Sequence, residues 1–417
     1  MTAVSRLLRA GQPVWLDGAG RATRRYPILS GSLTADVVVV GGGMTGALVA
    51  HAFASAGVST VLVEGALVGR GSTAASSALL LQEPDLELTQ LVQRYGVRRA
   101  KRIWQLSRDS VRGLVARLTE LRIGCDLRPC DAVYYTTTAD AVDGLRRECA
   151  LRNRHGFDAH WLGPAALRTL TGIAGHGAIR TRGSARFDPY RACVGMVRAA
   201  VAAGARVFER SPVHRIFTKG DRVRVHTRGG VVSADRVVIA TGYATAQFRP
   251  LAGRFRMYRT YVVATAPLTA AQRAHLGLSD VLVWDTEHPY HYARWAPGHH
   301  LLLGGADRIV RPHEKRAPLF AAATRELREH FESRFPTLAD VDAALAWEGL
   351  FAITPDSLPY IGPHRRYPRH WFALGYGGNG MTFGFLAARL LLERWQETMT
   401  DDHALFEFGR TRQRTTR

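Results

Sequence analysis

The clearest hydrophobic pattern in the chain is an uninterrupted run of valines at residues 37–40, followed directly by glycines. Such a run is typical of a parallel strand that is buried on both faces. Residues 44–56 are rich in Ala and Leu and predict a helix, and residues 59–63 predict a second strand. Strand, helix and strand in this order predict a parallel βαβ unit, and therefore an α/β fold.

Other segments continue this pattern. We expect helices over residues 86–121 and 189–203, a helix ending near residue 396, and strands over residues 131–137, 205–208, 211–213 and 234–242. Residues 172–188 are rich in Gly and Arg without periodicity, and predict a connection between elements. Residues 257–263 and 290–295 alternate between polar and apolar positions, as half-buried strands do, and residues 300–305 predict a third strand nearby.

The glycines after the first strand have the spacing G-x-G-x-x-G. Gly41 can form the tight turn, Gly43 leaves room for a pyrophosphate, and Gly46 lets the helix pack against the strand. Glu64 ends the second strand about 20 residues later, where a dinucleotide-binding motif places its ribose-binding carboxylate. An ordinary Gly-rich turn is the alternative, but the order of strand, glycines, helix, strand and acid favours a dinucleotide site.

Three later segments extend this site. Residues 71–78 follow the second strand and are rich in small and hydroxyl residues, which suits a backbone that lies close to a ligand. The strand over residues 234–242 ends in Ala-Thr-Gly, and four glycines within residues 375–380 precede the last helix. A nicotinamide dehydrogenase has no particular need of the strand that ends in Ala-Thr-Gly, and without a flavin the later glycines would be an ordinary turn before a helix. The two segments together favour FAD, because a Gly-rich helix N-terminus can stabilise the negative charge of a reduced flavin.

Composition supports an enzyme of two domains. The chain has 417 residues, of which 46% are hydrophobic. Neither a membrane-spanning run nor a secretory signal is evident, so we expect a cytoplasmic protein. The net charge of +21 comes mainly from scattered arginines, which predicts no specific nucleic-acid partner. The four cysteines form no C-x-x-C pair, and His288, His291, His299 and His300 lack carboxylates at ligand spacing in the sequence, so no metal site is expected.

Together these segments resemble the FAD-dependent D-amino-acid oxidase superfamily, in the branch of glycine oxidase, sarcosine oxidase and γ-glutamylputrescine oxidoreductase. The resemblance rests on residues 36–64, 71–78, 237–242, 347–362 and 375–382. It implies a Rossmann-type FAD-binding domain built from residues 1–85, 170–245 and 345–417. It also implies a substrate domain with a mixed or antiparallel sheet, built from residues 86–169 and 246–344.

The resemblance also implies the residues of the site. The expected FAD-binding residues are Gly41, Gly42, Gly43, Met44, Thr45, Gly46, Glu64, Gly71, Ser72, Thr73, Ser76, Val213, Ala240, Thr241, Gly242, Gly349, Gly377, Gly378, Asn379, Gly380, Met381 and Thr382. Alternating strand positions predict Tyr258, His291 and Arg294 as catalytic residues and Tyr292 as a substrate-binding residue, although each is equally compatible with sheet surface or core.

The implied activity is oxidation of the C–N bond of an amine or amino acid. A hydride passes to the flavin, the imine is hydrolysed, and oxygen or another acceptor reoxidises the cofactor. A nicotinamide-dependent dehydrogenase, a glycine-type or D-amino-acid oxidase and a flavin-containing nucleic-acid-binding protein remain alternatives.

Two departures from the family pattern refine this expectation. Gly349 stands where sarcosine-oxidase-like members carry a cysteine bonded to the flavin, so non-covalent FAD is expected. Phe351 stands where glycine-oxidase-like members carry an arginine that grips the substrate carboxylate, so Phe351 is expected to line the substrate pocket. An amine is then favoured over a simple α-amino acid, unless Arg294 or Arg259 supplies a carboxylate clamp.

Overall fold

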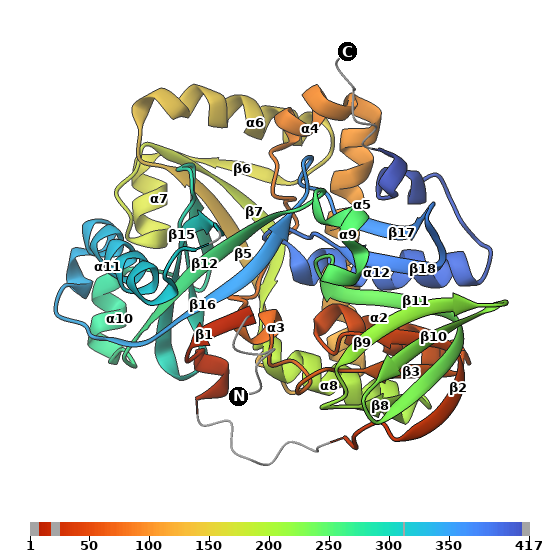
Figure 1. Cartoon of the computed structure of the whole chain (residues 1–417). Helices are drawn as coiled ribbons and strands as arrows, with labels where there is room; N and C mark the ends of the chain where they lie inside the picture. The colour runs from red at the N-terminus through yellow and green to blue at the C-terminus, as the bar shows by residue number, and fades with distance from the viewer. Residues whose placement is uncertain (1–7, 18–25, 312, 411–417) are drawn as a thin grey trace.

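Two sheets organise the chain, one built around parallel strands and the other mixed (Figure 1). The computed structural model describes residues 8–17, 26–311 and 313–410. Within these residues one sheet has eight strands and the other has ten. The α/β class, with a Rossmann-type sheet and a second mixed sheet, is therefore confirmed.

The eight-stranded sheet has the order β17-β18-β11-β2-β3-β8, with β10 and β9 attached to β11. Its central five strands are parallel, as the unbroken apolar run at residues 37–40 predicts. The strands are β2 (Gly31–Val40), β3 (Thr60–Val63), β8 (Arg206–Phe208), β9 (Val213–Lys219), β10 (Arg222–Thr227), β11 (Gly230–Gly242), β17 (Tyr360–His364) and β18 (Tyr367–Leu374).

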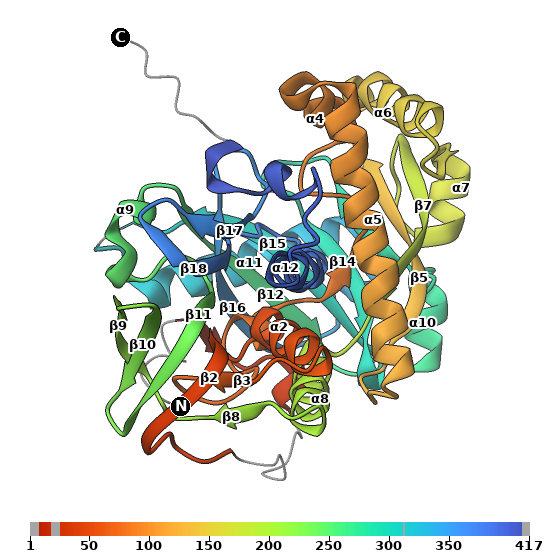
Figure 2. The same cartoon turned by 90° about the vertical axis from the view of Figure 1, so that its right-hand side faces the viewer.

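Helices cover one face of this sheet and enclose the largest hydrophobic core (Figure 2). The covering helices are α2 (Met44–Ser55), α5 (Val97–Glu120), α8 (Pro189–Ala202) and α12 (Gly380–Trp395). Helix α2 packs between α8 and α12, and α5 lies against α12. The first strand and its helix are thus held at the centre of the domain. Although α5 lies in a segment expected to belong to the substrate domain, its buried side chains join this core.

The ten-stranded sheet has the order β1-β16-β12-β15-β14-β13-β5-β7-β4, with β6 attached to β7. Its pairs are antiparallel except β5 and β13. The strands are β1 (Arg9–Gly11), β4 (Leu79–Leu80), β5 (Arg128–Thr136), β6 (Ala159–Leu162), β7 (Gly177–Arg186), β12 (Arg256–Thr265), β13 (Leu282–Asp285), β14 (Tyr292–Ala296), β15 (His300–Ile309) and β16 (Ala343–Ile353).

Helix α11 (Arg316–Arg334) packs on strands β12 and β15 of this sheet, where a second hydrophobic core lies. The remaining helices are α3 (Ser72–Ala75), α4 (Leu88–Tyr95), α6 (Val142–Arg154), α7 (Pro164–Thr171), α9 (Arg249–Ala252) and α10 (Ala270–Leu276). Among the described residues, no helix combines the length and the apolar character that crossing a membrane requires.

Two segments lie in a different sheet from the one that the sequence predicted. Strand β7 occupies residues expected to form a connection, and it pairs with β5 and β6 in the ten-stranded sheet. Strand β16 joins the same sheet beside β12. Residues 177–186 and 343–353 thus belong structurally with the expected substrate segments. Strand β7 has buried residues on both faces and few large apolar side chains, so it shows no period of two.

Candidate functional site

A cavity of about 700 Å³ lies at the carboxyl ends of β2, β3 and β11. In open α/β sheets this edge is where nucleotides bind. Side chains of the ten-stranded sheet, among them Thr260, Tyr292 and Phe351, also line the cavity. The two sheets therefore build one site, with the nucleotide end on the parallel sheet.

The three motif glycines have distinct structural roles at this edge. Gly41 has φ +110°, and a Cβ there would lie 2.6 Å from the carbonyl oxygen of Ala240. A Cβ on Gly46 would overlap the carbonyl oxygen of Gly41, so this glycine sets the contact between helix and strand. Gly43 lines the cavity, and within 4 Å its Cβ would meet only the Thr73 hydroxyl, at 3.1 Å. A side chain at Gly43 would therefore take up ligand space.

Glu64 lies at the end of β3 and lines the same cavity. Its Oε2 accepts the N–H of Gly42 at 2.7 Å, and its Oε1 accepts the N–H of Ala66 at 2.7 Å. Burial raises the pKa of this carboxyl. The two backbone donors fix its orientation, as recognition of a ribose hydroxyl requires.

Short helix α3 lies directly beside the glycines and also lines the cavity. The Thr73 hydroxyl accepts the N–H of Met44 at 3.0 Å, which satisfies one free donor at the start of α2. The lining also includes most of the other expected FAD-binding residues, namely Met44, Thr45, Gly71, Ser72, Ser76, Val213, Ala240, Thr241, Gly242 and Gly349.

The glycines before α12 line the far end of the cavity. The residues there are Gly377, Gly378, Asn379, Gly380 and Met381. Asp85 holds this turn, because its carboxylate accepts the N–H of Gly378 at 2.7 Å and the side-chain amide of Asn379 at 2.9 Å. One N–H that was expected to face the flavin is therefore bonded to a side chain of the protein.

Three of the expected FAD-binding residues do not line the cavity. Gly42 donates its N–H to Glu64, Gly46 packs against Gly41, and Thr382 donates its hydroxyl to the Leu81 carbonyl at 3.1 Å. Each of the three residues contacts a residue that does line the cavity, and so supports the cavity wall. The remaining set fits FAD, because the glycine cradle, the oriented carboxylate of Glu64 and the second glycine turn lie along one continuous cavity.

The expected substrate residues divide into two groups. Tyr292 and Phe351 line the cavity, whereas Tyr258, His291 and Arg294 do not. Tyr258 stacks on Phe351 from behind, with ring centroids 5.7 Å apart. The fully buried guanidinium of Arg294 lies 4.8 Å from the ring centre of Trp15 and donates to the Phe187 carbonyl at 3.0 Å. Placing these three side chains in the pocket is therefore wrong, because strand alternation does not identify the face that a cavity occupies.

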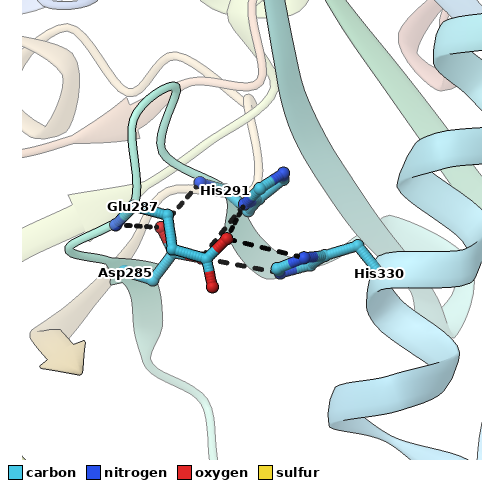
Figure 3. Close-up of side chains that lie close together, drawn as sticks. All are labelled: Asp285, Glu287, His291 and His330. Atoms are coloured by element: carbon cyan, nitrogen blue, oxygen red, sulfur yellow. Dashed lines mark hydrogen bonds and ion pairs between the residues drawn. The ribbon is translucent and has the colours of Figure 1, made fainter. Parts of the chain in front are cut away.

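His291 instead belongs to a cluster at the edge of the cavity, drawn in Figure 3. Its Nδ1 lies 3.1 Å from Asp285 Oδ2, and its ring stacks on that of His330 with centroids 3.6 Å apart. Glu287 completes the cluster and also binds Arg334. The expectation that His291 has no carboxylate at ligand spacing is thus wrong, since Asp285 and Glu287 come six and four residues before it and the turn between β13 and β14 brings them to its ring. His330, on α11, is the one member of the cluster that is remote in sequence.

Most polar atoms of this cluster have partners within the protein, although the buried Nε2 of His330, 3.5 Å from Asp285 Oδ2, makes no hydrogen bond among the described residues. Asp285 accepts the backbone N–H groups of Glu287 and His291 at 3.1 and 3.0 Å. Burial acts to raise the pKa of Asp285, but the neighbouring side chains of His291 and His330 outweigh it and lower this pKa to about 2. The Arg334 cation already neutralises Glu287. The arrangement explains how the ends of β13, β14 and α11 are held together.

Sequence reasoning missed the acidic side chains of the cavity. Asp85 and Glu87 follow β4, and Asp307 lies near the end of β15. Glu83, Asp85 and Glu87 alternate along one short stretch, whereas Asp307 is a single acid, and only the fold brings it to the same cavity as the other three. The proline before Asp85 and the glycines before Asp307 gave a signal for turns but none for a ligand.

Comparison with known proteins agrees with this geometry. A family model described as DAO, FAD dependent oxidoreductase, matches residues 36–394. The chain is 25% identical to "Probable oxidoreductase OrdL" of Haemophilus influenzae, over 88% of this chain and 84% of that protein. It is 27% identical to the γ-glutamylputrescine oxidoreductase of Escherichia coli, over 88% and 85%.

Among solved structures, glycine oxidase from Geobacillus kaustophilus has a TM-score of 0.78. The identity is 22%, and the match covers 91% of this chain and all of that one, so it bears on the fold. The family model spans the glycine cradle, Glu64 and both later glycine segments that line the cavity. The chain belongs to the family of FAD dependent oxidoreductases.

Proposed function

We propose that this protein oxidises the C–N bond of an amine with non-covalently bound FAD. The observation that carries the proposal is the continuous cavity that joins the glycine cradle to a chamber lined by Tyr292 and Phe351. Relatives named for γ-glutamylputrescine and for glycine support a C–N substrate. Oxygen or another acceptor would reoxidise the cofactor.

When bound, FAD supplies a two-electron acceptor. The substrate carbon next to nitrogen loses a hydride and the nitrogen loses a proton, which leaves an imine that water hydrolyses to a carbonyl compound and an amine or ammonia. The glycine cradle and Glu64, which line the cavity, would hold the cofactor. The protein's own contribution is to orient the C–H bond and to exclude water, which the aromatic side chains of the chamber can do.

Two observations support non-covalent FAD. Gly349 lines the cavity at the position where some relatives carry a cysteine, and it has no side chain to react. Of the four cysteines, all within the described part of the chain, Cys125, Cys149 and Cys193 are buried and Cys130 is half-buried, and none lines the cavity.

Preference for an amine rests on the missing carboxylate clamp. Phe351 lines the cavity where an arginine would bind an α-carboxylate. Arg259 is occupied by Glu348 at 2.7 Å, and Arg294 is buried under Trp15. A carboxylate in this chamber would lose water without gaining a charged partner from these residues.

The test is anaerobic mixing of the FAD-loaded protein with amines and amino acids. We expect alkyl and secondary amines to bleach the flavin absorbance faster than glycine, sarcosine, D-alanine or proline do. A higher kcat/KM for the small amino acids would overturn the preference for amines. Absence of bleaching by every compound would overturn the proposed activity itself.

A further inference from the structure

The charges around the cavity are opposite to those of the whole chain. The chain contains 56 Lys and Arg against 35 Asp and Glu, yet Arg152 is the one Lys or Arg found among the described lining residues. Seven acids line the cavity, namely Glu64, Glu83, Asp85, Glu87, Asp285, Glu287 and Asp307. Glu64 serves the ribose of FAD. The other six do not suit FAD, whose pyrophosphate is itself an anion.

Arg152 does not neutralise the chamber. Its Nε donates to Glu148 at 2.7 Å, its Nη1 donates to Glu83 at 3.3 Å, and its guanidinium lies 4.7 Å from the ring centre of Trp104. This cation is therefore committed to two carboxylates, one of which lines the cavity. Asp85, which holds the glycine turn, and Asp307 form no ion pair with a Lys or Arg among the described residues.

Two lining acids have an oxygen without a donor. Glu83 is 4% exposed, and its Oε2 has no hydrogen-bond partner among the described residues. The same holds for Oδ1 of Asp307, whose carboxylate otherwise takes a hydrogen bond from Thr260. A buried carboxylate oxygen without a partner is unfavourable, so a ligand that brings N–H donors would satisfy it.

Burial raises the pKa of Asp85 to about 7 and that of Asp307 to about 6. Their proximity to each other adds to the rise for Asp85. A bound cation would lower both values, because it favours the ionised form of a carboxyl group. Asp85 already accepts two hydrogen bonds, and a carboxylate can accept more.

Aromatic rings complete the chamber. Tyr134 and Trp284 stack with centroids 5.3 Å apart, and Tyr134 donates its hydroxyl to Glu87 at 3.0 Å. Tyr290 and Tyr292 lie on the neighbouring strand end, with centroids 6.1 Å apart. All four rings line the cavity. Ring faces next to carboxylates are the environment that proteins use to bind ammonium groups.

We propose that Asp85, Asp307 and Glu87 bind a second, protonated amino group of the substrate, so that the enzyme acts on diamines or polyamines. This inference rests on the proposed amine oxidation. The nitrogen that reacts must be unprotonated, whereas the remote nitrogen keeps its charge and is recognised by the acids. Chain length between the two nitrogens then decides which carbon reaches the flavin.

Three compounds of similar shape test the inference. Putrescine ends in a second ammonium group, pentylamine ends in a methyl group at the same place, and γ-aminobutyrate ends in a carboxylate. We expect kcat/KM for putrescine to exceed that for pentylamine by about tenfold or more, the size of one charge-assisted hydrogen bond. The carboxylate compound should be the poorest of the three.

Substitutions of the lining acids test whether these acids cause the preference for putrescine over pentylamine. Asp307→Asn keeps the shape of the side chain and should bring the ratio of kcat/KM for putrescine to kcat/KM for pentylamine towards one. Glu87→Gln should act in the same direction, and it decides the question if Asp307→Asn loses its flavin. Asp340→Asn, at an exposed position remote in sequence from these acids, is the control and should leave the ratio unchanged.

The outcomes separate this inference from the proposed function. If pentylamine bleaches the flavin as efficiently as putrescine, or if both variants keep the wild-type ratio, the inference is wrong while amine oxidation stands. If no amine or amino acid bleaches the flavin of a fully loaded protein, both are wrong. A preference for putrescine that both variants reduce supports the inference.

Discussion

Single residues decide whether the cavity can hold a cofactor. Gly41 and Gly46 are fixed by neighbouring backbone atoms, so substitutions there disturb the fold as well as the site. Gly43 differs, because the space beside it belongs to the cavity and a hydroxyl is the nearest protein atom. Its substitution should therefore affect ligand binding with little effect on folding.

We expect Gly43→Val to purify folded but without flavin, because the valine methyls would stand where the pyrophosphate binds. The measurement is flavin absorbance per mole of protein, together with circular dichroism as a check of folding. Gly124→Val is the matched control, since no atom lies within 4 Å of a Cβ at that position. Full flavin content in the Gly43 variant would show that the pyrophosphate lies elsewhere.

Gly349 leads to a second expectation at this scale. Acid precipitation of the holoprotein should release all of the flavin into the supernatant, because no cysteine lines the cavity. The measurement compares flavin absorbance in the supernatant and in the washed pellet. Yellow colour that stays with the pellet would contradict non-covalent binding.

The residues of the chamber show where sequence reasoning stops. Gly43 and Glu64 could be predicted, because a local motif fixes both the backbone and the ligand. Asp85 and Asp307 could not be predicted, since they lie more than two hundred residues apart in the sequence. The pairing of β12 with β15 places Asp307, and the contact with the turn before α12 places Asp85, so that both acids reach one chamber. Arg294 occupies a strand position that the alternating pattern assigns to the pocket, yet its side chain is buried and does not line the cavity.

At the scale of elements, the parallel strands were predictable and β7 was not. Apolar runs in the sequence predict strands β2, β3 and β11, because both faces of these strands are buried. Strand β7 is also buried in many positions, but with Gly, Ala and Arg, and partners on both sides hold it in place. Neighbouring strands override weak intrinsic propensity in such a case.

Helix α6 illustrates how a buried charge connects elements. Glu148 accepts the backbone N–H groups of Leu88 and Thr89 at 2.8 and 2.9 Å, so it caps α4, while Arg152 pairs with Glu148 and Glu83. These three side chains are almost fully buried. Loss of the cation would leave two carboxylates facing each other without compensation.

We expect Arg152→Met to lower the free energy of unfolding by about 3–5 kcal/mol, the range for breaking a buried ion pair by removing one partner. Urea titration followed by circular dichroism measures the change. Arg154→Met, at an exposed position on the same helix, is the control and should change stability by less than about 0.5 kcal/mol. Equal effects of the two substitutions would refute a special role of the buried cation.

At the scale of the whole molecule, the cavity lies between the two sheets, because residues of both sheets line it. A ligand that contacts both sheets stabilises the folded state by mass action. Removal of FAD should therefore lower the melting temperature, and added FAD should restore it in a concentration-dependent way. At about 100 times the dissociation constant the gain is about 2.7 kcal/mol. A melting temperature independent of FAD would contradict binding of FAD to this site of the folded protein.

An acidic chamber inside a strongly basic molecule also has a kinetic consequence for substrate capture. A dication approaching a protein of net charge +21 is repelled over distances beyond contact, although the chamber itself attracts it. Salt screens the long-range repulsion more than the contacts at buried carboxylates, since the Debye length is about 10 Å at 0.1 M. The second-order rate constant for putrescine should therefore rise with ionic strength at low salt, the reverse of electrostatic steering, while that for an uncharged probe stays flat. Stopped-flow measurement of flavin reduction at several salt concentrations gives this dependence of the rate constant on ionic strength. A rate constant that falls as salt is added would show that substrates enter through an opening with a locally negative potential.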